Sequence, residues 1–288
     1  MTIDCHYHLD TRVQPLENLL LKMDKHGIEK TALIPTMCDP IPHTPEFGLK
    51  IMRFFLTHRL FRGLAKKIVA KFTPEGDIIL PKSILSIYKD PDNKPVADTL
   101  VAHPDRFFGW IFVNPKGQND PVEEYEKWKG REGYIGIKAH PFWHQYAPKE
   151  LLPIAKKASE VGMPLLIHVG FDDHGDFLPI IDQLPKLKVI LAHTGFPNYS
   201  DTWKLIQGRD NIWVDLSADA YVDAKTTRSA VDFLGPERCL FGTDGPYGRT
   251  ETDDFFDNGF IKRRLERLFP DKGVQKRLFR DNFNAIIS

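Results

Sequence analysis

Short apolar segments rich in β-branched and aromatic residues alternate along the chain with segments of helical periodicity. Each apolar segment is bounded by Gly, Pro, Asn or Asp, which is typical of β-strands. Eight strands are predicted on this basis: Ile3–His8, Thr31–Pro35, Phe107–Val113, Ile135–Ala139, Leu165–Val169, Lys188–His193, Ile212–Leu216 and Cys239–Asp244.

Helical segments lie between most of these strands, and several begin with Pro or with a capping Asp or Ser. The predicted helices are Pro15–His26, Pro121–Lys129, Pro148–Val161, Phe177–Leu184, Tyr199–Gln207 and Asp223–Leu234, with closing helices in Asn258–Phe269 and Gln275–Ile286. The alternation predicts an α/β fold, a (β/α)8 TIM barrel made by residues 1–288 as one domain. An open doubly wound sheet is the alternative, but no glycine-rich turn follows the first strand.

One segment, residues 36–95, interrupts the alternation after the second strand. Its middle part, Glu46–Phe72, is amphipathic and rich in Lys, Arg and Phe, so we expect a helical insertion. Long insertions in compact domains usually serve as lids or binding loops. A surface segment that only packs against the barrel explains the pattern equally well.

Composition narrows the range of partners. Lys+Arg and Asp+Glu both number 39, so the chain lacks the positive surplus of a nucleic-acid binder or a polybasic membrane binder. No apolar run approaches the roughly 18 residues of a spanning helix, and the N-terminus lacks the pattern of a signal peptide. Three distant cysteines do not suggest a disulfide framework. We therefore expect a cytoplasmic protein with a small-molecule substrate and no nucleic-acid or membrane partner; a homo-oligomer stays open.

The first strand contains His6 and His8. Because side chains on a strand alternate between faces, these two imidazoles share a face, about 7 Å apart along the strand. They can converge on one cation, although a purely structural histidine pair is the alternative. In this register Ile3, Cys5 and Tyr7 face the outer helices, so Cys5 is expected to be a packing residue.

Polar residues also close three later strands, namely His168, His193 and Asp244. In a barrel the carboxyl ends of the strands form one face, where active sites lie. A buried imidazole or carboxylate costs free energy unless it is paired or binds a metal. Histidines with a carboxylate match the ligand set of a catalytic zinc site with an open position.

The fourth predicted strand ends in Lys138 and His140, which share a face. Lys138 could hydrogen-bond a substrate, pair with an acid, or carry a carbamate that bridges two metals. Pairing with a neighbouring acid is the simplest interpretation.

Five motifs together define a resemblance: Ile3–His8, Gly136–Pro141, Leu166–His168, Leu191–Gly195 and Phe241–Pro246. With these motifs the chain resembles the amidohydrolase superfamily, in particular the amidohydrolase-related branch that includes aminocarboxymuconate-semialdehyde decarboxylase and related aromatic-acid decarboxylases. The resemblance runs from residue 3 to about residue 286 and is weakest over residues 36–95.

The resemblance implies roles for individual residues. His6, His8, His168 and Asp244 would bind one divalent metal, usually Zn²⁺. His193 would be a catalytic histidine that does not need the metal, and Lys138 would be uncarbamylated. With such a metal, Asp244 can accept a proton from an activated water, and His193 can stabilise an oxyanion or protonate a leaving group.

Three functions are compatible with these residues. The first is a metal-dependent hydrolase of a small ester, lactone or amide, and the second is a non-oxidative decarboxylase of an unsaturated or aromatic acid. The third, a non-catalytic ligand-binding barrel, predicts a missing metal ligand, and none is missing. Substrate contacts are expected from Lys138, His140, Arg12, Trp143, Tyr247 and Arg249. Together the aromatic residues Phe142, Trp143, Phe171, Phe196 and Tyr247 suggest a planar or apolar substrate, while ordinary loop packing is the simpler interpretation of any one of them.

Overall fold

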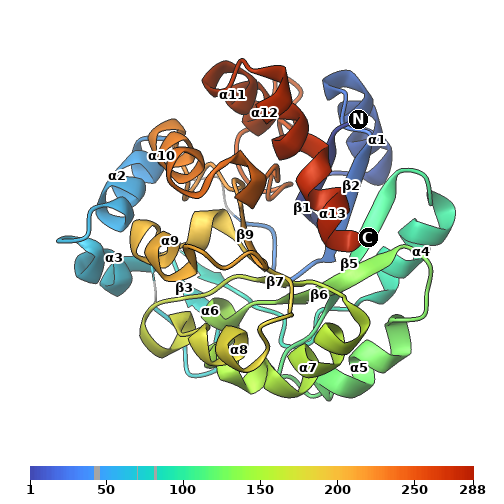
Figure 1. Cartoon of the computed structure of the whole chain (residues 1–288), viewed down its shortest axis with the longest axis vertical. Coiled ribbons are helices and arrows are strands. Elements are labelled where there is room, and N and C mark those ends of the chain that lie inside the picture. Colours follow the sequence, from blue (N-terminus) through green and yellow to red (C-terminus); the bar gives the residue numbers. More distant parts are fainter. Residues whose placement is uncertain (42–45, 70, 81–82) are drawn as a thin grey trace.

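Eight parallel strands form the centre of the protein in the computed structural model, which describes residues 1–41, 46–69, 71–80 and 83–288. Their order in the sheet is β1-β2-β5-β6-β7-β8-β9-β10, with helices arranged around them (Figure 1). The strands are β1 Ile3–Leu9, β2 Lys30–Pro35, β5 Phe107–Phe112, β6 Tyr134–Ala139, β7 Leu165–Ile167, β8 Val189–Leu191, β9 Ile212–Asp215 and β10 Cys239–Leu240. Each predicted strand is confirmed, most of them with shorter bounds.

Hydrogen bonds between the first strand and the segment after β10 close the sheet into a barrel. The Cys5 amide donates to the Phe241 carbonyl over 3.0 Å, and the Asp244 amide donates to the His6 carbonyl over 2.8 Å. The predicted last strand is short because its second half leaves regular geometry, with φ of 62° at Asp244. The predicted (β/α)8 barrel is thus confirmed.

Helices cover the outside of the barrel and follow the predicted pattern closely. They are α1 Leu16–His26, α4 Lys94–Ala102, α5 Pro121–Trp128, α6 Pro141–His144, α7 Leu152–Val161, α8 Leu178–Gln183, α9 Ser200–Ile206, α10 Ala224–Leu234, α11 Phe260–Leu268, α12 Lys272–Lys276 and α13 Asn282–Ile287. Helices α4 and α6 were not predicted: the short apolar face of α4 directly follows the insertion, and α6 is only four residues long. A π-helical turn, Arg277–Asp281, separates α12 from α13. Among the described residues no helix is both long enough and apolar enough to cross a bilayer.

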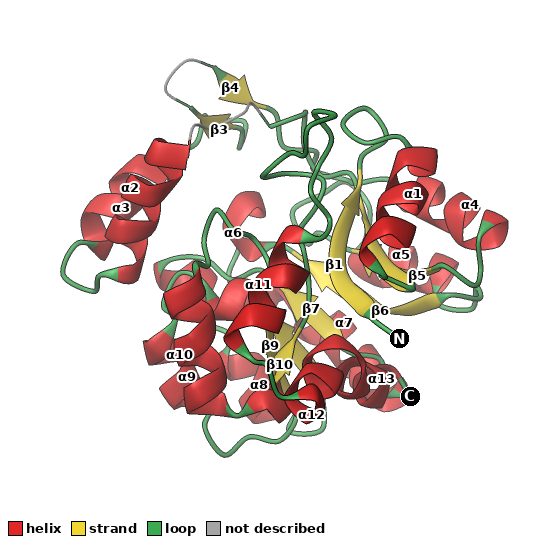
Figure 2. Cartoon of the chain, turned by 90° about the horizontal axis from the view of Figure 1, so that it is seen from above, coloured by secondary structure: helices red, strands yellow, loops and turns green. Residues whose placement is uncertain are grey.

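The insertion between β2 and β5 contains a helical pair and a small hairpin. Helices α2 (Glu46–Thr57) and α3 (Arg62–Val69) lie side by side, apart from the barrel sheet (Figure 2). Strands β3 (Ile78–Ile79) and β4 (Ile84–Leu85) pair antiparallel. The prediction of a helical insertion is confirmed, while its positions 42–45, 70 and 81–82 lie outside the described residues.

A register shift in β1 corrects one prediction about side-chain direction. The pairing with β2 is irregular between Asp4 and Tyr7, as in a β-bulge. As a result Ile3 and Cys5 pack in the buried cluster of Trp110 and Leu166, on the inner face of the barrel, while Tyr7 packs toward the helices. The predicted outward position is therefore wrong for Ile3 and Cys5 and right for Tyr7. Cys5 is still a packing residue.

Candidate active site

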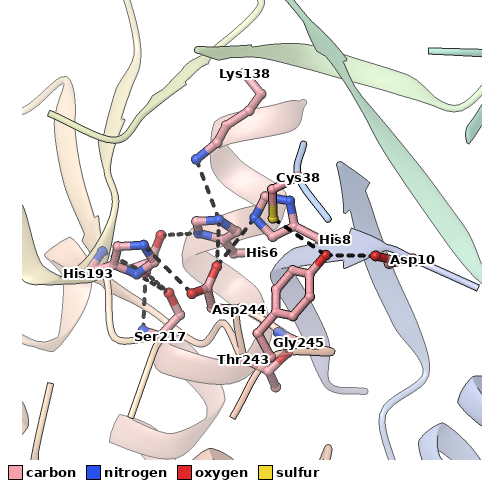
Figure 3. A network of polar contacts seen from close by, with 12 residues as sticks. His6, His8, Asp10, Cys38, Lys138, His193, Ser217, Thr243, Asp244 and Gly245 are labelled. Atoms are coloured by element: carbon pink, nitrogen blue, oxygen red, sulfur yellow. Dashed lines mark hydrogen bonds and ion pairs between the residues drawn. The ribbon is translucent and has the colours of Figure 1, made fainter. Parts of the chain in front are cut away.

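Two histidines and an aspartate converge at the carboxyl ends of the strands (Figure 3). His6 and His8 come from β1, and Asp244 follows β10, its neighbour across the barrel closure. The Asp244 Oδ1 atom lies 3.3 Å from His6 Nε2 and 3.4 Å from His8 Nε2. One ligand atom from each of the three residues lies within 4.8 Å of the others. The sequence prediction placed these same three residues together.

Asp215, at the end of β9, fixes the proton on His6. Its Oδ2 atom lies 2.9 Å from His6 Nδ1, and both side chains are fully buried. Burial alone would raise the pKa of Asp215, but the contacts with His6, His193 and Ser217 hold it well below its usual range. An ionised carboxylate only accepts hydrogen bonds, so His6 Nδ1 must be the donor. Burial also lowers the pKa of His6, which keeps the ring neutral and leaves a lone pair on Nε2.

The lone pair on His6 Nε2 faces the Asp244 carboxylate, which is also a hydrogen-bond acceptor. His6 Nε2 and the Asp244 carboxylate lie 3.3 Å apart, and two acceptors at that distance need a positive charge between or beside them. The donor set of imidazole nitrogens and a carboxylate oxygen fits a divalent cation such as zinc. The buried His168 Nε2 lacks a hydrogen-bond partner within the described part of the chain, which fits the predicted role of this residue in binding a cation.

Lys138 approaches the same nitrogen from β6. Its Nζ atom lies 3.5 Å from His6 Nε2 (Figure 3), and the side chain is fully buried. Burial lowers the pKa of Lys138 to about 8, although Asp215 and Asp244 oppose the shift. The contact of Lys138 is with His6, while Asp215 and Asp244 act on it through their charge. Its predicted pairing with a neighbouring acid stays a prediction.

His193 lies on the other side of Asp244. Its Nδ1 atom is 2.8 Å from Ser217 Oγ, and the Ser217 hydroxyl donates to Asp215 Oδ1 over 2.5 Å. Because the single hydroxyl proton is used, Ser217 Oγ accepts from His193, so Nδ1 is protonated and Nε2 carries the lone pair. His193 Nε2 lies 3.9 Å from Asp244 Oδ2. Burial lowers the pKa of His193 to about 4 against the pull of Asp244 and Asp215.

The charge on Asp244 is maintained by its neighbours. Burial would raise the pKa of this carboxyl, but the contacts with His193, His8 and His6 hold it at about 2. His193 and Asp244 also share an unusual backbone, with φ of 53° and 62°. Non-glycine residues held in this region cost about 1–3 kcal/mol and cluster at functional sites.

His168 lies beside this group. Its ring is 4.5 Å from the ring of His193 and 4.0 Å from that of His140. Burial and the neighbouring histidines hold the pKa of His168 and of His140 well below the usual value, so both rings are neutral. Neutral imidazole is the form that binds metals. The predicted role of His168 as a metal ligand stays a prediction.

Two of the predicted substrate contacts, Arg12 and Tyr247, both bind Asp10. Arg12 donates from Nε and Nη2 to the two carboxylate oxygens of Asp10 over 2.9 and 2.8 Å. Tyr247 donates to Asp10 Oδ2 over 2.9 Å, and its ring lies 6.1 Å from that of His8. A substrate carboxylate would have to compete with Asp10 for Arg12.

The other predicted contacts lie around the same mouth. The Trp143 ring stacks 4.7 Å from that of His140. Arg249 donates to Asp219 over 2.7 Å, and Asp219 also accepts from Arg264 over 3.0 Å. Arg249, on the loop after β10, is therefore part of an ion-pair cluster around Asp219, which lies on the loop after β9.

A cavity of about 290 Å³ lies between the insertion, α6 and the segment after β7. Its apolar wall includes Phe142 and Phe171, and the Phe142 ring lies 6.0 Å from that of His168. The lining residues are Lys66, Phe72, Phe142, Gln145, Phe171, Asp172, Asp173 and His174. Two of these, Lys66 and Phe72, belong to the insertion, so the insertion shapes this cavity.

Another group of possible ligands, His26, Glu251 and Asp257, has a structural explanation. Glu251 accepts from Lys22, Lys25 and His26 over 2.6, 2.5 and 2.6 Å. Basic side chains of α1 already surround the Glu251 carboxylate, so this group is an ion-pair network that joins α1 to the segment after β10.

Sequence reasoning missed Asp215 and Ser217. Asp215 follows the same rule that identified the histidines, because it closes the apolar run Ile212–Val214 at the carboxyl end of a strand. Ser217 carried no signal in the sequence, since its role depends on its contact with His193.

Fold and site together define a (β/α)8-barrel enzyme whose histidines and aspartates converge at one mouth of the barrel. The chain belongs to the amidohydrolase family, because the family model described as Amidohydrolase matches residues 3–282.

Solved structures with the same fold carry several activities in their descriptions. One is 2,6-dihydroxybenzoate decarboxylase from Rhizobium, with a TM-score of 0.63, 16% identity, and coverage of 99% of this chain and 98% of that one. A probable 2-pyrone-4,6-dicarboxylic acid hydrolase from Acinetobacter baumannii has a TM-score of 0.60, 14% identity and coverage of 99% and 98%. A 4-oxalomesaconate hydratase from Rhodopseudomonas palustris has a TM-score of 0.64, 16% identity and coverage of 100% and 95%. At these identities the similarity shows the shared fold.

Proposed function

We propose that this chain is a metal-dependent hydrolase of a small ester, lactone or amide. The observation that carries the proposal is the approach of His6 Nε2, His8 Nε2 and Asp244 Oδ1 to one another, with His193 on the other side of Asp244. His6, His8, His168 and Asp244 would hold the ion. When bound, a zinc ion supplies an activated water at neutral pH and polarises a carbonyl group.

The side chains of this site divide the proton transfers between them. Asp244 is ionised and can accept a proton as the water attacks the substrate carbonyl. His193 Nε2 carries a lone pair 3.9 Å from Asp244 Oδ2, so it can take this proton and pass it to the leaving group. Ser217 and Asp215 hold the His193 ring in the required tautomer throughout.

A decarboxylase of an aromatic or unsaturated acid is the second candidate. It is favoured by the aromatic surroundings of His168, which include Phe142, Phe196 and Tyr221 with ring centroids 6.0, 5.4 and 6.0 Å away. The resemblance in fold to 2,6-dihydroxybenzoate decarboxylase supports the same candidate. The existing pairing of Arg12 with Asp10 argues against it, because a substrate carboxylate must displace that contact.

Product analysis separates the two reactions. The full chain is loaded with zinc and incubated with a panel of lactones, esters and amides, and in parallel with aromatic and unsaturated carboxylic acids. Release of a new carboxylic acid from the first panel, absent in Asp244→Asn, is the expected result. Release of carbon dioxide from the second panel without turnover of the first would contradict the proposal and support the decarboxylase.

A further inference from the structure

The helical pair of the insertion turns large apolar side chains toward the solvent. Six of the fourteen large hydrophobic side chains that are exposed in the described part of the chain lie on α2, on α3 or in the turn between them. We call this set the outer face; it consists of Phe47, Ile51, Phe54, Leu60, Phe61 and Leu64. Phe47 and Leu60 are 75% and 92% exposed. The rings of Phe54 and Phe61 stack 5.9 Å apart, which makes the outer face continuous across the two helices.

Three basic side chains of the same helices, Arg53, Arg62 and Lys66, reach acids of the barrel, while Lys50, Lys67 and Arg59 in the turn between the helices are exposed. Arg53 donates to the backbone carbonyl of Asp219 and lies 3.5 Å from its carboxylate. Arg62 lies 3.2 Å from the carboxylate of Asp201 on α9, and Lys66 pairs with Asp172 after β7. Leu56 and Ala65 of the same helices are buried in the core, so the pair is apolar on both sides and the outer face lies opposite the side that packs on the barrel.

The size of the outer face is close to one half of a stable protein interface. At about 200 Å² for each fully exposed large side chain, its six members expose about 600–700 Å² of apolar surface. The largest apolar patch on a typical monomer is about 300–600 Å² and is often functional. A standard interface buries about 800 Å² on each partner, which the outer face and its polar edge can supply.

We propose that the outer face binds a second copy of this chain, with α2 and α3 of one protomer packed against α2 and α3 of its partner. Phe47, Ile51 and Phe54 follow the i, i+4, i+7 spacing of a helix-packing stripe. Two such pairs related by a two-fold axis bury the same stripe on both copies, which is the commonest symmetry of soluble oligomers.

The positions of the basic side chains on α2 and α3 favour a second copy of this chain over an anionic lipid surface as the partner. Helices that bind such membranes place Lys and Arg beside the apolar face, where they reach the lipid headgroups. Here Arg53, Arg62 and Lys66 are paired with acids of the barrel, so they are directed away from that role. Lys50 and Lys67 are exposed, and their long side chains can place their charges at the solvated edge of a protein interface.

The test measures the mass of the full chain in solution. Sedimentation velocity and light scattering from 0.1 to about 50 µM should show a species with the mass of two 33.1 kDa chains. The double variant Phe54→Asp with Leu60→Asp should weaken this association at least a hundredfold. The matched control, Leu21→Asp with Val161→Asp, replaces two exposed apolar residues on α1 and α7 and should stay dimeric. Circular dichroism spectra of all three proteins should be the same, because the altered side chains are exposed.

Three results would overturn the proposal. The unaltered chain could be monomeric at every concentration, or its oligomer could persist in the outer-face variant. Alternatively, a monomeric chain could float with vesicles of phosphatidylglycerol but not with phosphatidylcholine, and lose that binding in the outer-face variant, which would assign the outer face to a lipid surface. None of these measurements depends on enzymatic activity.

Discussion

Replacing Asp215 with Asn tests how the site prepares His6 for a metal. In the native protein Asp215 Oδ1 accepts from the His193 amide, the Ser217 amide and the Ser217 hydroxyl, over 3.0, 3.1 and 2.5 Å. Its Oδ2 accepts from His6 Nδ1 over 2.9 Å. In Asp215→Asn the amide oxygen can keep the first three contacts, but the amide NH₂ then faces a ring nitrogen that also donates.

The His6 ring resolves this conflict by moving its proton to Nε2, so that Nδ1 accepts from the new amide. The lone pair that faces Asp244 is then lost. Loss of such an outer contact to a metal-binding histidine costs about 10–100-fold in metal affinity, or about 1.4–2.7 kcal/mol. The metal-free protein should lose only about 1–2 kcal/mol of unfolding free energy, because the number of hydrogen bonds is preserved while one of them loses its charge.

Competition with a chromophoric chelator measures the zinc affinity, and urea denaturation of chelated protein measures the stability. Ser217→Ala is the matched control, since it removes one donor to Asp215 and leaves the His6 contact intact. Its zinc affinity should stay within about threefold of the native value. Native zinc affinity in Asp215→Asn would refute the proposed role of Asp215.

Three further predictions concern catalysis, packing and charge. Exchange of His193 for Ala should lower kcat by about 10²–10⁴-fold with the metal content unchanged; loss of the metal as well would make His193 a ligand. A methyl group at Gly136 would lie 2.5 Å from a backbone carbonyl oxygen, so Gly136→Ala should cost about 1–3 kcal/mol in urea denaturation. Gly130→Ala, with no atom within 4 Å of the new carbon, should be neutral, and equal stability of the two variants would refute this packing. Burial would raise the pKa of Glu251, but two lysines and a histidine lower it from 4.5 to about 2. The ionised Glu251 therefore stabilises the folded protein fully above pH 4.5, and this contribution is lost as the pH falls toward 2. Glu251→Gln should cost about 1 kcal/mol at pH 7 and less toward pH 3, unlike the exposed Glu160→Gln; a deficit that does not change with pH would speak against the ion pairs.

Much of the barrel and its candidate site followed from local pattern. The apolar runs predicted all eight strands, and polar residues at their ends identified His168, His193 and Asp244. This works because parallel strands of a barrel bring their carboxyl ends to one face, whatever the distance in sequence. The same rule applies to Asp215, which was missed because it was counted as part of the strand rather than as its polar end.

Other features depend on contacts that no local pattern encodes. The bulge in β1 lies in a segment whose alternation looks regular, and it reverses the direction of Ile3 and Cys5. The contact of Arg53 with Asp219 joins residues 166 positions apart in the chain. It also explains why the amphipathic pattern of α2 was read correctly as a helix but could not reveal which side faces the barrel.

The most direct test of the account is the metal content of the purified full chain, measured by plasma mass spectrometry beside the variants His6→Asn and His8→Asn. The account predicts about one divalent ion in the native chain and a loss of most of it in either variant, while Lys25→Asn on the surface of α1 retains it. A native chain that binds no divalent ion when supplied with zinc, or an ion that stays bound without His6 and His8, would contradict the claim that these residues form a metal site.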